Sequence, residues 1–575
     1  MTSYIHPDPA QLPLADPAVE HVLATRGTGG YRQYRIPALA VTAHGTVLAA
    51  YDGRPNLDDL PSPIDLLLRR STDSGHTWSS QKVVRTGKGL EGFGDPSLLV
   101  DMETQRVFLF HAAGTRAGFF EATAGQDPDD EYVQHCDLSF SDDDGLTWQH
   151  RRITSQLKSS TDRPVTGIFA AAGQGIQIHS GPFTGRLVQQ FVVLCEGNIM
   201  AASAYSDDHG DSWALGQLIG EHTHGFSPNE NKVVALKDGR LLLHSRSTPR
   251  RLAATSHDGG ATWSALVPVE ELPDPSDNGS LVRFDGLPHV AGLAGGSTDS
   301  WLLATNNHDA ALRRNTVLSL SPDDGLTWPA KLVLCTGSSA YSTATRLPDG
   351  NIGVLYERQG YREIVFTSVP AEQITQQLAA PPETSSGDGP GLEFDIELRS
   401  MTPGRPARWL NAGEFHVLPS NTEGWNVHTW KEIGQGYTEE SAQIIGTREA
   451  QDLNYGHITP GYKAGDILAF TGRARNGGTL PVTQVHLDGP GADAFPAEDL
   501  LPGAEALYFT PTHTVTEDEV KRGSVEVTYT VEGVVGGSRH RTSRTFHFDT
   551  ATGSVREEHM PWRGPASRRR VAELP

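Results

Sequence analysis

A short segment near the middle of the chain has a glutamate at the start and an arginine near the end of a hairpin pattern with largely apolar strands. The segment reads ENKVVALKDGRLLLHSRS and spans residues 230–247. Its Asp-Gly pair is a hairpin-turn signal, and the apolar runs on both sides predict two strands. Glu230 stands at the head of the first strand, and Arg246 stands near the end of the second. Packing alone gives no reason for an arginine there, so a polar site is indicated.

Further arginines occur in similar settings. Arg35, in YRQYRIPAL, precedes Ile36 and Pro37, which is unusual for a plain core strand. Arg313 and Arg314 are adjacent in LRRNTVLSLS, and side-chain alternation lets only one of them face a given side of a strand. Arginines gathered at one point repel each other, and their natural ligand is a carboxylate gripped by the planar guanidinium groups.

The charge balance restricts the partners of the chain. Its formal net charge is -23, so nucleic acid and anionic membranes are poor partners for the whole protein. No apolar run approaches the roughly 18 residues of a membrane span. The start of the chain, MTSYIHPDPAQLPLADP, lacks the basic and apolar regions of a signal peptide. A cytoplasmic location is therefore expected, with secretion left open if a signal was removed or export is non-classical.

The sequence offers no signature of a metal site or a cofactor site. Cys136, Cys195 and Cys335 are few and widely spaced, which indicates buried free thiols rather than a disulfide framework or a zinc site. The histidines are scattered, and no HxxxH or CxxC pair stands out. We therefore expect no metal ion and no cofactor.

One pattern, S-x-D-x-G-x-[TS]-W, recurs five times in the first two thirds of the chain. Successive copies start 70, 65, 50 and 65 residues apart, at Ser71, Ser141, Ser206, Ser256 and Ser321. In such a turn the aspartate caps backbone N–H groups, the glycine supplies a positive φ, and the tryptophan packs onto the next strand. A turn repeated at this interval between strand-like runs predicts the blades of a β-propeller.

The five segments resemble the Asp-box of sialidases, and YRIP resembles the motif near the start of sialidase propellers. The resemblance covers about residues 20–370 and is closest to bacterial exo-α-sialidases. It implies an all-β chain in which residues 1–378 form a six-bladed β-propeller with Asp-box repeats. The boxes lie on the outer rim in that family, so their own residues are expected to be structural. Inner strand ends surround the propeller axis, where residues distant in sequence converge.

The resemblance gives the arginines a shared role. Arg35, Arg246 and Arg313 match the three arginines that bind the carboxylate of a sialic acid, with Arg314 as the alternative to Arg313. Glu357, in IGVLYER, matches the glutamate that supports the first arginine.

The same resemblance implies a catalytic trio. Tyr341, in SSAYSTATRLPDG, matches the nucleophile, and Glu230 matches its base. A neutral phenol suits an attack on a carbon that already bears a carboxylate, because a carboxylate nucleophile would be repelled. Asp59, in DLPSP, matches the acid on a loop over the pocket, with Asp58 as the neighbouring alternative.

Two further positions match residues that contact the substrate. Arg54, in DGRP, matches an arginine on the O4 side of the sugar or behind it. Asp95, in FGDPSLLVD, matches an aspartate near the O4 and N-acetyl groups.

The last third of the chain differs from the rest in composition and residue pattern. A chain of 575 residues is expected to form more than one domain. Residues 379–391 are rich in Pro, Gly and Ser and predict a linker. Residues 392–550 alternate like antiparallel strands and resemble the immunoglobulin-like β-sandwich modules appended to bacterial glycosidases. Residues 551–575 predict a disordered tail.

The implied activity is that of a retaining exo-α-sialidase, which removes terminal sialic acid from oligosaccharides, glycoproteins or glycolipids. A trans-sialidase or an anhydro-forming sialidase would share the same core residues. A sialic-acid-binding propeller without activity would keep the arginines and lose the Tyr, Glu and Asp set. A purely structural Asp-box propeller would need neither.

Overall fold

The computed structural model describes most of the chain. The described residues are 12–220, 227–285, 298–310, 312–379, 392–402, 418–421, 424–426, 461–476, 480–492, 495, 497–501, 507–509 and 511–560. Two compact units can be distinguished, residues 1–382 with 405–460 and residues 383–404 with 461–575. Residues 380–391, which hold nearly all of the predicted linker, lie outside the described residues.

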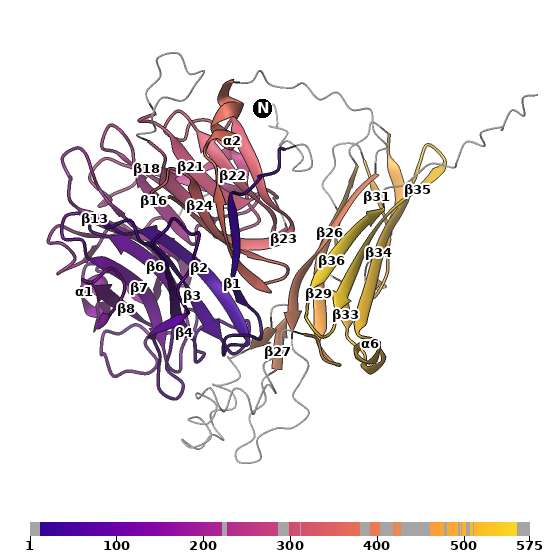
Figure 1. Cartoon of the computed structure of the whole chain (residues 1–575), viewed down its shortest axis with the longest axis horizontal. Helices are drawn as coiled ribbons and strands as arrows, with labels where there is room; N and C mark the ends of the chain where they lie inside the picture. The colour runs from indigo at the N-terminus through magenta and orange to yellow at the C-terminus, as the bar shows by residue number, and fades with distance from the viewer. Residues whose placement is uncertain are drawn as a thin grey trace, which may run out of the picture. The chain divides into compact units, whose positions relative to one another are not determined.

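The first unit contains six four-stranded antiparallel blades, which confirms the predicted propeller (Figure 1). Blades one and two comprise β2 (Gln33–Val41), β3 (Val47–Arg54), β4 (Asp65–Ser71), β5 (Lys82–Arg85), β6 (Gly92–Val100), β7 (Val107–Gly114), β8 (His135–Ser141) and β9 (Gln149–Arg152). Blades three and four comprise β10 (Val165–Ala170), β13 (Leu187–Cys195), β14 (Asn198–Ser206), β15 (Ala214–Leu215), β16 (Asn231–Ala235), β17 (Leu241–Ser245), β18 (Arg250–Ser256) and β19 (Val267–Pro273). Blades five and six comprise β20 (Ser280–Arg283), β21 (Leu302–Asn307), β22 (Arg314–Ser321), β23 (Ala330–Arg346), β24 (Ile352–Arg358), β25 (Glu363–Val369) and β1 (Val19–Thr25).

Two features close the ring of blades. The N-terminal strand β1 pairs with β25, so the last blade takes one strand from each end of the propeller sequence. Strand β23 serves two blades: its first half pairs with β22 as the outer strand of blade five, and its second half pairs with β24 as the inner strand of blade six. Two short strands, β11 (Gly173–Gln174) and β12 (Ile176–Gln177), join neighbouring blades near the axis. The propeller also holds helices α1 (Thr154–Lys158), α2 (Glu372–Thr375) and η2 (Gln376–Ala379).

Each repeated segment forms the turn between the third and fourth strands of a blade, as its residue types predict. In the first copy the Ser71 hydroxyl accepts a hydrogen bond from the Gly75 N–H at 2.8 Å, and Asp73 accepts one from the Thr77 N–H at 2.9 Å. Gly75 has φ +88°, where a side chain would be strained. The Trp78 ring packs edge-on against Phe366 of the neighbouring blade. The turn therefore fixes both the hairpin and the contact between blades.

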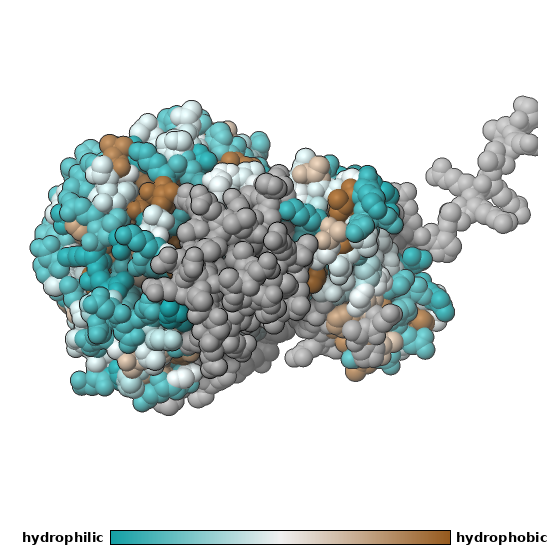
Figure 2. All heavy atoms as spheres, turned by 90° about the horizontal axis from the view of Figure 1, so that it is seen from below, coloured by the Kyte–Doolittle hydropathy of each residue, from teal (hydrophilic) through white to brown (hydrophobic). Residues whose placement is uncertain are grey.

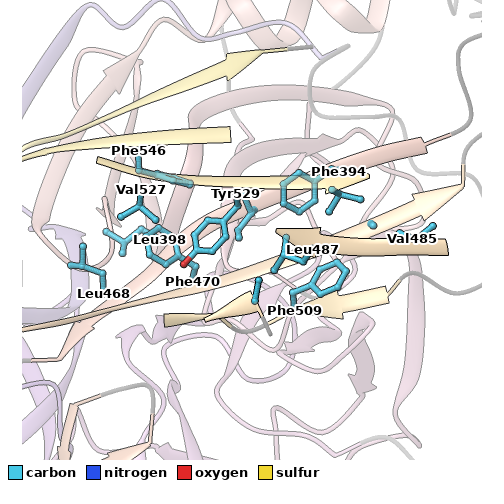
Figure 3. Packing of buried hydrophobic residues seen from close by; sticks show 14 of the residues in the cluster. Phe394, Leu398, Leu468, Phe470, Val485, Leu487, Phe509, Val527, Tyr529 and Phe546 are labelled. Carbon is cyan, nitrogen blue, oxygen red and sulfur yellow. The ribbon is translucent and has the colours of Figure 1, made fainter. Parts of the chain in front are cut away.

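The second unit is a two-layered β-sandwich. One sheet contains β26 (Leu392–Thr402), β29 (Ile467–Asn476), β32 (Leu507–Phe509) and β33 (Thr512–Thr514), and the other contains β31 (Glu498–Leu500), β30 (Val482–Asp488), β34 (Ser524–Val535), β35 (Ser538–Asp549) and β36 (Val555–Met560). Apolar side chains from both sheets fill the space between them, with Phe470, Tyr529 and Phe546 in contact (Figure 3). Helix α6 (Glu517–Arg522) precedes β34, and its N-terminus has a capping box between Thr516 and Glu519.

The sandwich extends beyond its predicted end at residue 550. Strand β36 pairs with β35 in register from Ser543 to Phe548, so residues 555–560 are part of the sheet and not of a disordered tail. The alternation in VREEHM is too short and too charged to predict an edge strand from sequence. Residues 561–575 lie outside the described residues. A separate hairpin joins β27 (Leu418–Asn421) and β28 (Gly424–Asn426).

The surface in the view of Figure 2 is mainly hydrophilic, and its apolar residues lie in small separate groups. Among the described residues, none of the helices combines the length and the apolar character that crossing a membrane requires. The large side chains in the interior, such as Trp301 and Trp328, are almost fully buried. Separate clusters of buried hydrophobic side chains between neighbouring blades stabilise the propeller.

Candidate active site

The strands β2 and β6, which begin blades one and two, each contain a shift in their pairing register. The pairing of β2 with its neighbour shifts register after Arg35, and that of β6 shifts after Gly94. Ile36 and Asp95 follow these points, each directly before a proline and each with φ +60°. A positive φ is costly for side-chain-bearing residues, and such strain gathers at functional sites. Here the bulge frees the Ile36 N–H, which donates to Glu357 Oε1 at 2.8 Å.

Three guanidinium groups surround one tyrosine ring. The Cζ atoms of Arg35, Arg246 and Arg313 lie 5.1, 5.6 and 5.5 Å from the centre of the Tyr341 ring. These residues come from three different blades, and Tyr341 comes from the inner half of β23. The structure therefore brings together the three arginines that the sequence singled out.

Each of these arginines has a buried carboxylate beside it. Arg35 Nε lies 3.0 Å from Glu357 Oε1, and Arg313 Nε lies 3.2 Å from Asp277 Oδ1. Arg246 pairs with Glu230. The carboxylate side chains are at most 3% exposed, whereas the arginine side chains are 9–20% exposed. The carboxylates thus support the arginines from behind and leave part of each guanidinium accessible to an anionic ligand.

The Tyr341 hydroxyl is bound to the predicted base. It donates a hydrogen bond to Glu230 Oε2 at 2.7 Å and accepts one from Arg246 Nη1. Burial raises the pKa of Tyr341 well above its usual value, although Arg246 opposes this effect. The free protein therefore holds a neutral phenol with its proton directed at a carboxylate. This is the arrangement that a phenol nucleophile activated by a neighbouring base requires.

Arg54 holds the loop that carries the predicted acid. Its Nη1 donates to Asp59 Oδ1 at 2.7 Å and to the Asp58 carbonyl at 3.1 Å. Its Nε and Nη2 donate to Asp52 Oδ2 at 3.0 and 2.6 Å. Arg54 and Asp52 are fully buried, whereas the Asp59 side chain is 75% exposed. Asp52 and Arg54 thus form an interior anchor for an accessible carboxyl group.

The carboxyl groups near Arg54 influence each other. Burial raises the pKa of Asp52 to about 7, against the opposing effect of Arg54. Burial and the charges of Asp52 and Asp59 raise the pKa of Asp95 well above its usual value. Asp95 therefore takes up a proton at higher pH than an ordinary aspartate, and a protonated carboxyl can donate a hydrogen bond to a hydroxyl oxygen.

The two alternatives left by the sequence have different surroundings. Arg314 is buried, and its Nε donates to Asp309 Oδ2 at 2.7 Å, which directs it away from Tyr341. Asp58 accepts a hydrogen bond from Asn56 within the loop, at 3.1 Å. Arg313 Cζ, in contrast, lies 5.5 Å from the centre of the Tyr341 ring, and Asp59 accepts a hydrogen bond from Arg54.

Sequence reasoning missed three residues of this cluster. Asp52 precedes Arg54 by two positions on the same strand, so strand alternation in YDGR was a signal that could have found it. Asp277 belongs to the loop before β20, and nothing local marks it. The Tyr361 hydroxyl accepts a hydrogen bond from Arg313 Nη1 at 3.0 Å, and its ring lies 4.3 Å from Arg35 Cζ. Tyr361 lies between β24 and β25, in the blade that also carries Tyr341, and no local pattern marks it.

A search for metal-binding groups in the described part of the chain gives no cluster of three or more His, Cys, Asp or Glu side chains suited to a metal ion. The side chains gathered in the site are arginines, carboxyl groups and a phenol. Such a set can bind an anion, transfer protons and offer an oxygen nucleophile.

Comparisons with known proteins agree with this geometry. Residues 45–354 match the family model described as a BNR repeat-like domain. A sialidase of Micromonospora viridifaciens is 44% identical over 346 residues, which is 59% of this chain and 52% of that protein. The chain thus spans about half the length of this relative.

Two further relatives cover more of their own length. Sialidase-2 of Cricetulus griseus is 30% identical over 372 residues, which is 59% of this chain and 92% of that protein. The solved structure of the Hadza microbial sialidase Hz136 is 27% identical with a TM-score of 0.54, covering 62% of this chain and 69% of that one. The family model, the relatives and the solved structure agree, and the chain belongs to the sialidase family of BNR-repeat proteins.

Proposed function

We propose that the protein is a retaining exo-α-sialidase acting on the terminal sialic acid of oligosaccharides, glycoproteins or glycolipids. The observation that carries the proposal is the Tyr341 hydroxyl, which donates to Glu230 at 2.7 Å inside a ring of three arginines. A sialic acid bears its carboxylate on the anomeric carbon. A carboxylate bound by the arginines would therefore hold that carbon beside the tyrosine oxygen.

The first step forms a covalent intermediate. Tyr341 Oη bonds to the anomeric carbon while its proton passes to Glu230, and the bond to the leaving oxygen breaks. Asp59 gives its proton to that oxygen, which leaves as an alcohol. Lowering the phenol pKa from about 10 to 7 without a base would cost about 4 kcal/mol, and burial increases that cost here. Glu230 avoids the free phenolate by taking the proton as the bond forms.

The second step restores the enzyme. Water attacks the same carbon and gives a proton to Asp59, while Tyr341 leaves and recovers its proton from Glu230. Two displacements at one carbon return the original α configuration. The charge of the tyrosine, glutamate and aspartate set is therefore the same at the end as at the start.

Product analysis by NMR tests this proposal. Wild-type protein with 3′-sialyllactose should release the α-anomer of sialic acid first, followed by slow conversion to the β-anomer. Release of the β-anomer first would overturn the retaining mechanism. A 2,7-anhydro product or transfer to added lactose would instead identify the anhydro-forming or trans-sialidase activity that shares these residues.

The acid should show different pH dependence in the free and the bound enzyme. Desolvation raises the pKa of Asp59, but Arg54 and Arg35 outweigh it and hold that pKa below its usual value. A bound carboxylate offsets the charge of Arg35 and Arg246, so the pKa of Asp59 should rise on binding. Because Asp59 must be protonated to act, activity falls as pH rises through its pKa. The alkaline limb of kcat should therefore lie at higher pH than that of kcat/KM.

The variant Asp59→Asn tests whether Asp59 is the acid. The variant cannot donate the carboxyl proton, so kcat/KM for 3′-sialyllactose should fall about 100-fold and the alkaline limb should disappear. A fluorogenic phenolic sialoside needs less acid assistance and should lose less. Equal losses on both substrates would exclude Asp59 as the acid.

The propeller should suffice for the chemistry on small substrates. All the residues of the proposed mechanism lie before residue 379, the end of helix η2. Residues 1–379 alone are therefore expected to hydrolyse a fluorogenic sialoside with kcat/KM within about threefold of the full chain. A truncated protein that folds cooperatively by circular dichroism but is inactive would show that the C-terminal unit contributes to the site.

A further inference from the structure

A buried lysine, Lys232, lies close in the sequence to the proposed base, Glu230. Lys232 follows Glu230 by two positions, so both side chains point to the same side of the chain segment that enters β16. Lys232 is 1% exposed, and no carboxylate of the described residues lies within ion-pair distance of its Nζ. Gly173 faces its side chain so closely that a Cβ there would lie 2.9 Å from Lys232 Cε. The lysine is thus enclosed without a counter-ion.

Asn278 connects this lysine to the nucleophile segment. Lys232 Nζ donates to Asn278 Oδ1 at 2.7 Å, and the Asn278 carbonyl accepts from the Ser342 N–H at 3.0 Å. Asn278 Nδ2 donates to the Ala172 carbonyl at 3.0 Å, and Ala172 packs against Tyr341. Through its side chain and its backbone carbonyl, Asn278 therefore links segments of blades three, four, five and six next to the reacting tyrosine.

The energetics argue against a purely structural lysine. Burying an ammonium group without a counter-ion is costly, and an apolar side chain would fill the same space with less penalty. Burial and the charges of Arg251 and Arg246 act against the ammonium form, while Glu230 favours it, and the pKa of Lys232 is lowered to about 7. His244 lies opposite Lys232 in the register of β16 and β17, and burial lowers its pKa to about 3, so it adds no charge. At mildly acidic pH Lys232 is therefore charged.

We propose that Lys232 is a positioning residue of the reaction centre, which fixes Tyr341 through Asn278. The inference rests on the sialidase activity proposed above. The hydrogen bonds set where the phenol oxygen lies relative to Glu230. Lys232 itself touches neither the substrate nor the reacting atoms.

Kinetics of Lys232→Met, Asn278→Leu and the double variant test the inference, with Lys331→Met as the matched control. Lys331 is also buried, with Nζ donating to the Trp328 carbonyl at 2.8 Å, but it lies in the outer half of β23. Loss of positioning should lower kcat about 10- to 100-fold with KM within about threefold of wild type. The double variant should lose no more than the worse single variant, because both changes break one link.

The double variant also reduces the risk that misfolding, and not loss of positioning, explains a lower kcat. Replacing both partners of a buried polar contact by apolar side chains costs less than leaving one of them unpaired. In the double variant and in Lys232→Met, the loss should appear in kcat and not in KM at a temperature where the variants are folded. A merely structural role would lower the melting temperature without lowering kcat at that temperature, and the control should keep wild-type kinetics.

Two outcomes separate this inference from the proposed function. Wild-type kcat in the double variant would overturn the role of Lys232 while sialidase activity stands. A wild-type protein that hydrolyses no sialoside would overturn both. Loss of kcat in the Lys331→Met control to the same degree would also overturn the inference, because the effect would then follow from any buried lysine.

Discussion

Replacement of Tyr341 by phenylalanine is expected to lower kcat/KM for a fluorogenic sialoside at least about 1000-fold. Only one oxygen is lost, and the ring stays in its place between the guanidinium groups because it is 7% exposed and surrounded on all sides. Binding of a non-hydrolysable sialic acid analogue should therefore change little. The loss should appear in kcat, since the covalent bond can no longer form.

A second buried tyrosine supplies the control. Tyr356 lies in β24, is 1% exposed, and its hydroxyl is 3.5 Å from the Thr367 hydroxyl. Tyr356→Phe removes the same atom from the same kind of environment outside the arginine cluster, so its kinetics should match those of the wild type. Comparable losses in both variants would mean that the phenol oxygen matters for packing and not for chemistry.

Trapping of the intermediate gives independent evidence on the nucleophile. A 2,3-difluoro sialic acid slows both displacements, while its fluoride leaving group restores the first, so the adduct should accumulate. Peptide mapping should locate the label on Tyr341, and Tyr341→Phe should remain unlabelled. A label on Glu230 or Asp59 would contradict the proposed mechanism.

The repeated turns explain why the propeller could be predicted. Each box is a local structure: the hydroxyl of Ser71, the carboxylate of Asp73 and the positive φ of Gly75 act within eight residues, so sequence alone defines them. The shared strand β23 could not be predicted, because its division between two blades depends on strands from elsewhere in the chain. The edge strand β36 was missed for a similar reason, since pairing with β35 and not its own pattern makes it a strand.

The residues of the candidate site likewise fall into those that a local sequence pattern marks and those that it does not. Arg313 was preferred over Arg314 by motif and alternation, and the structure directs Arg313 at Tyr341 and pairs Arg314 with Asp309. Asp277 and Tyr361 are distant from Arg313 in the sequence and contact it only in the folded blades, which no local pattern records. The catalytic and binding roles of the predicted residues remain predictions that the kinetic experiments test.

Replacement of Arg246 by leucine should lower kcat/KM about 1000-fold or more. Hydrogen bonds from a guanidinium to a carboxylate are each worth about 1.5–3 kcal/mol, and 1000-fold corresponds to about 4 kcal/mol. Arg246 also pairs with Glu230, which is 3% exposed, so its loss leaves a buried carboxylate without its counter-charge. The melting temperature should therefore fall as well, and Arg246→Lys should recover part of the stability but little of the activity.

Arg313→Leu separates the two effects of Arg246. Arg313 pairs with the buried Asp277, so its loss should weaken carboxylate binding and lower the melting temperature while the pair of Arg246 with Glu230 stays in place. Wild-type protein should hydrolyse a free-acid sialoside far faster than its methyl ester, because an ester cannot accept the bidentate charge-assisted bonds. Both variants should lose this preference. Wild-type protein that treats acid and ester alike would contradict the arginine clamp, whereas a preference kept in both variants would assign carboxylate binding to Arg35 alone.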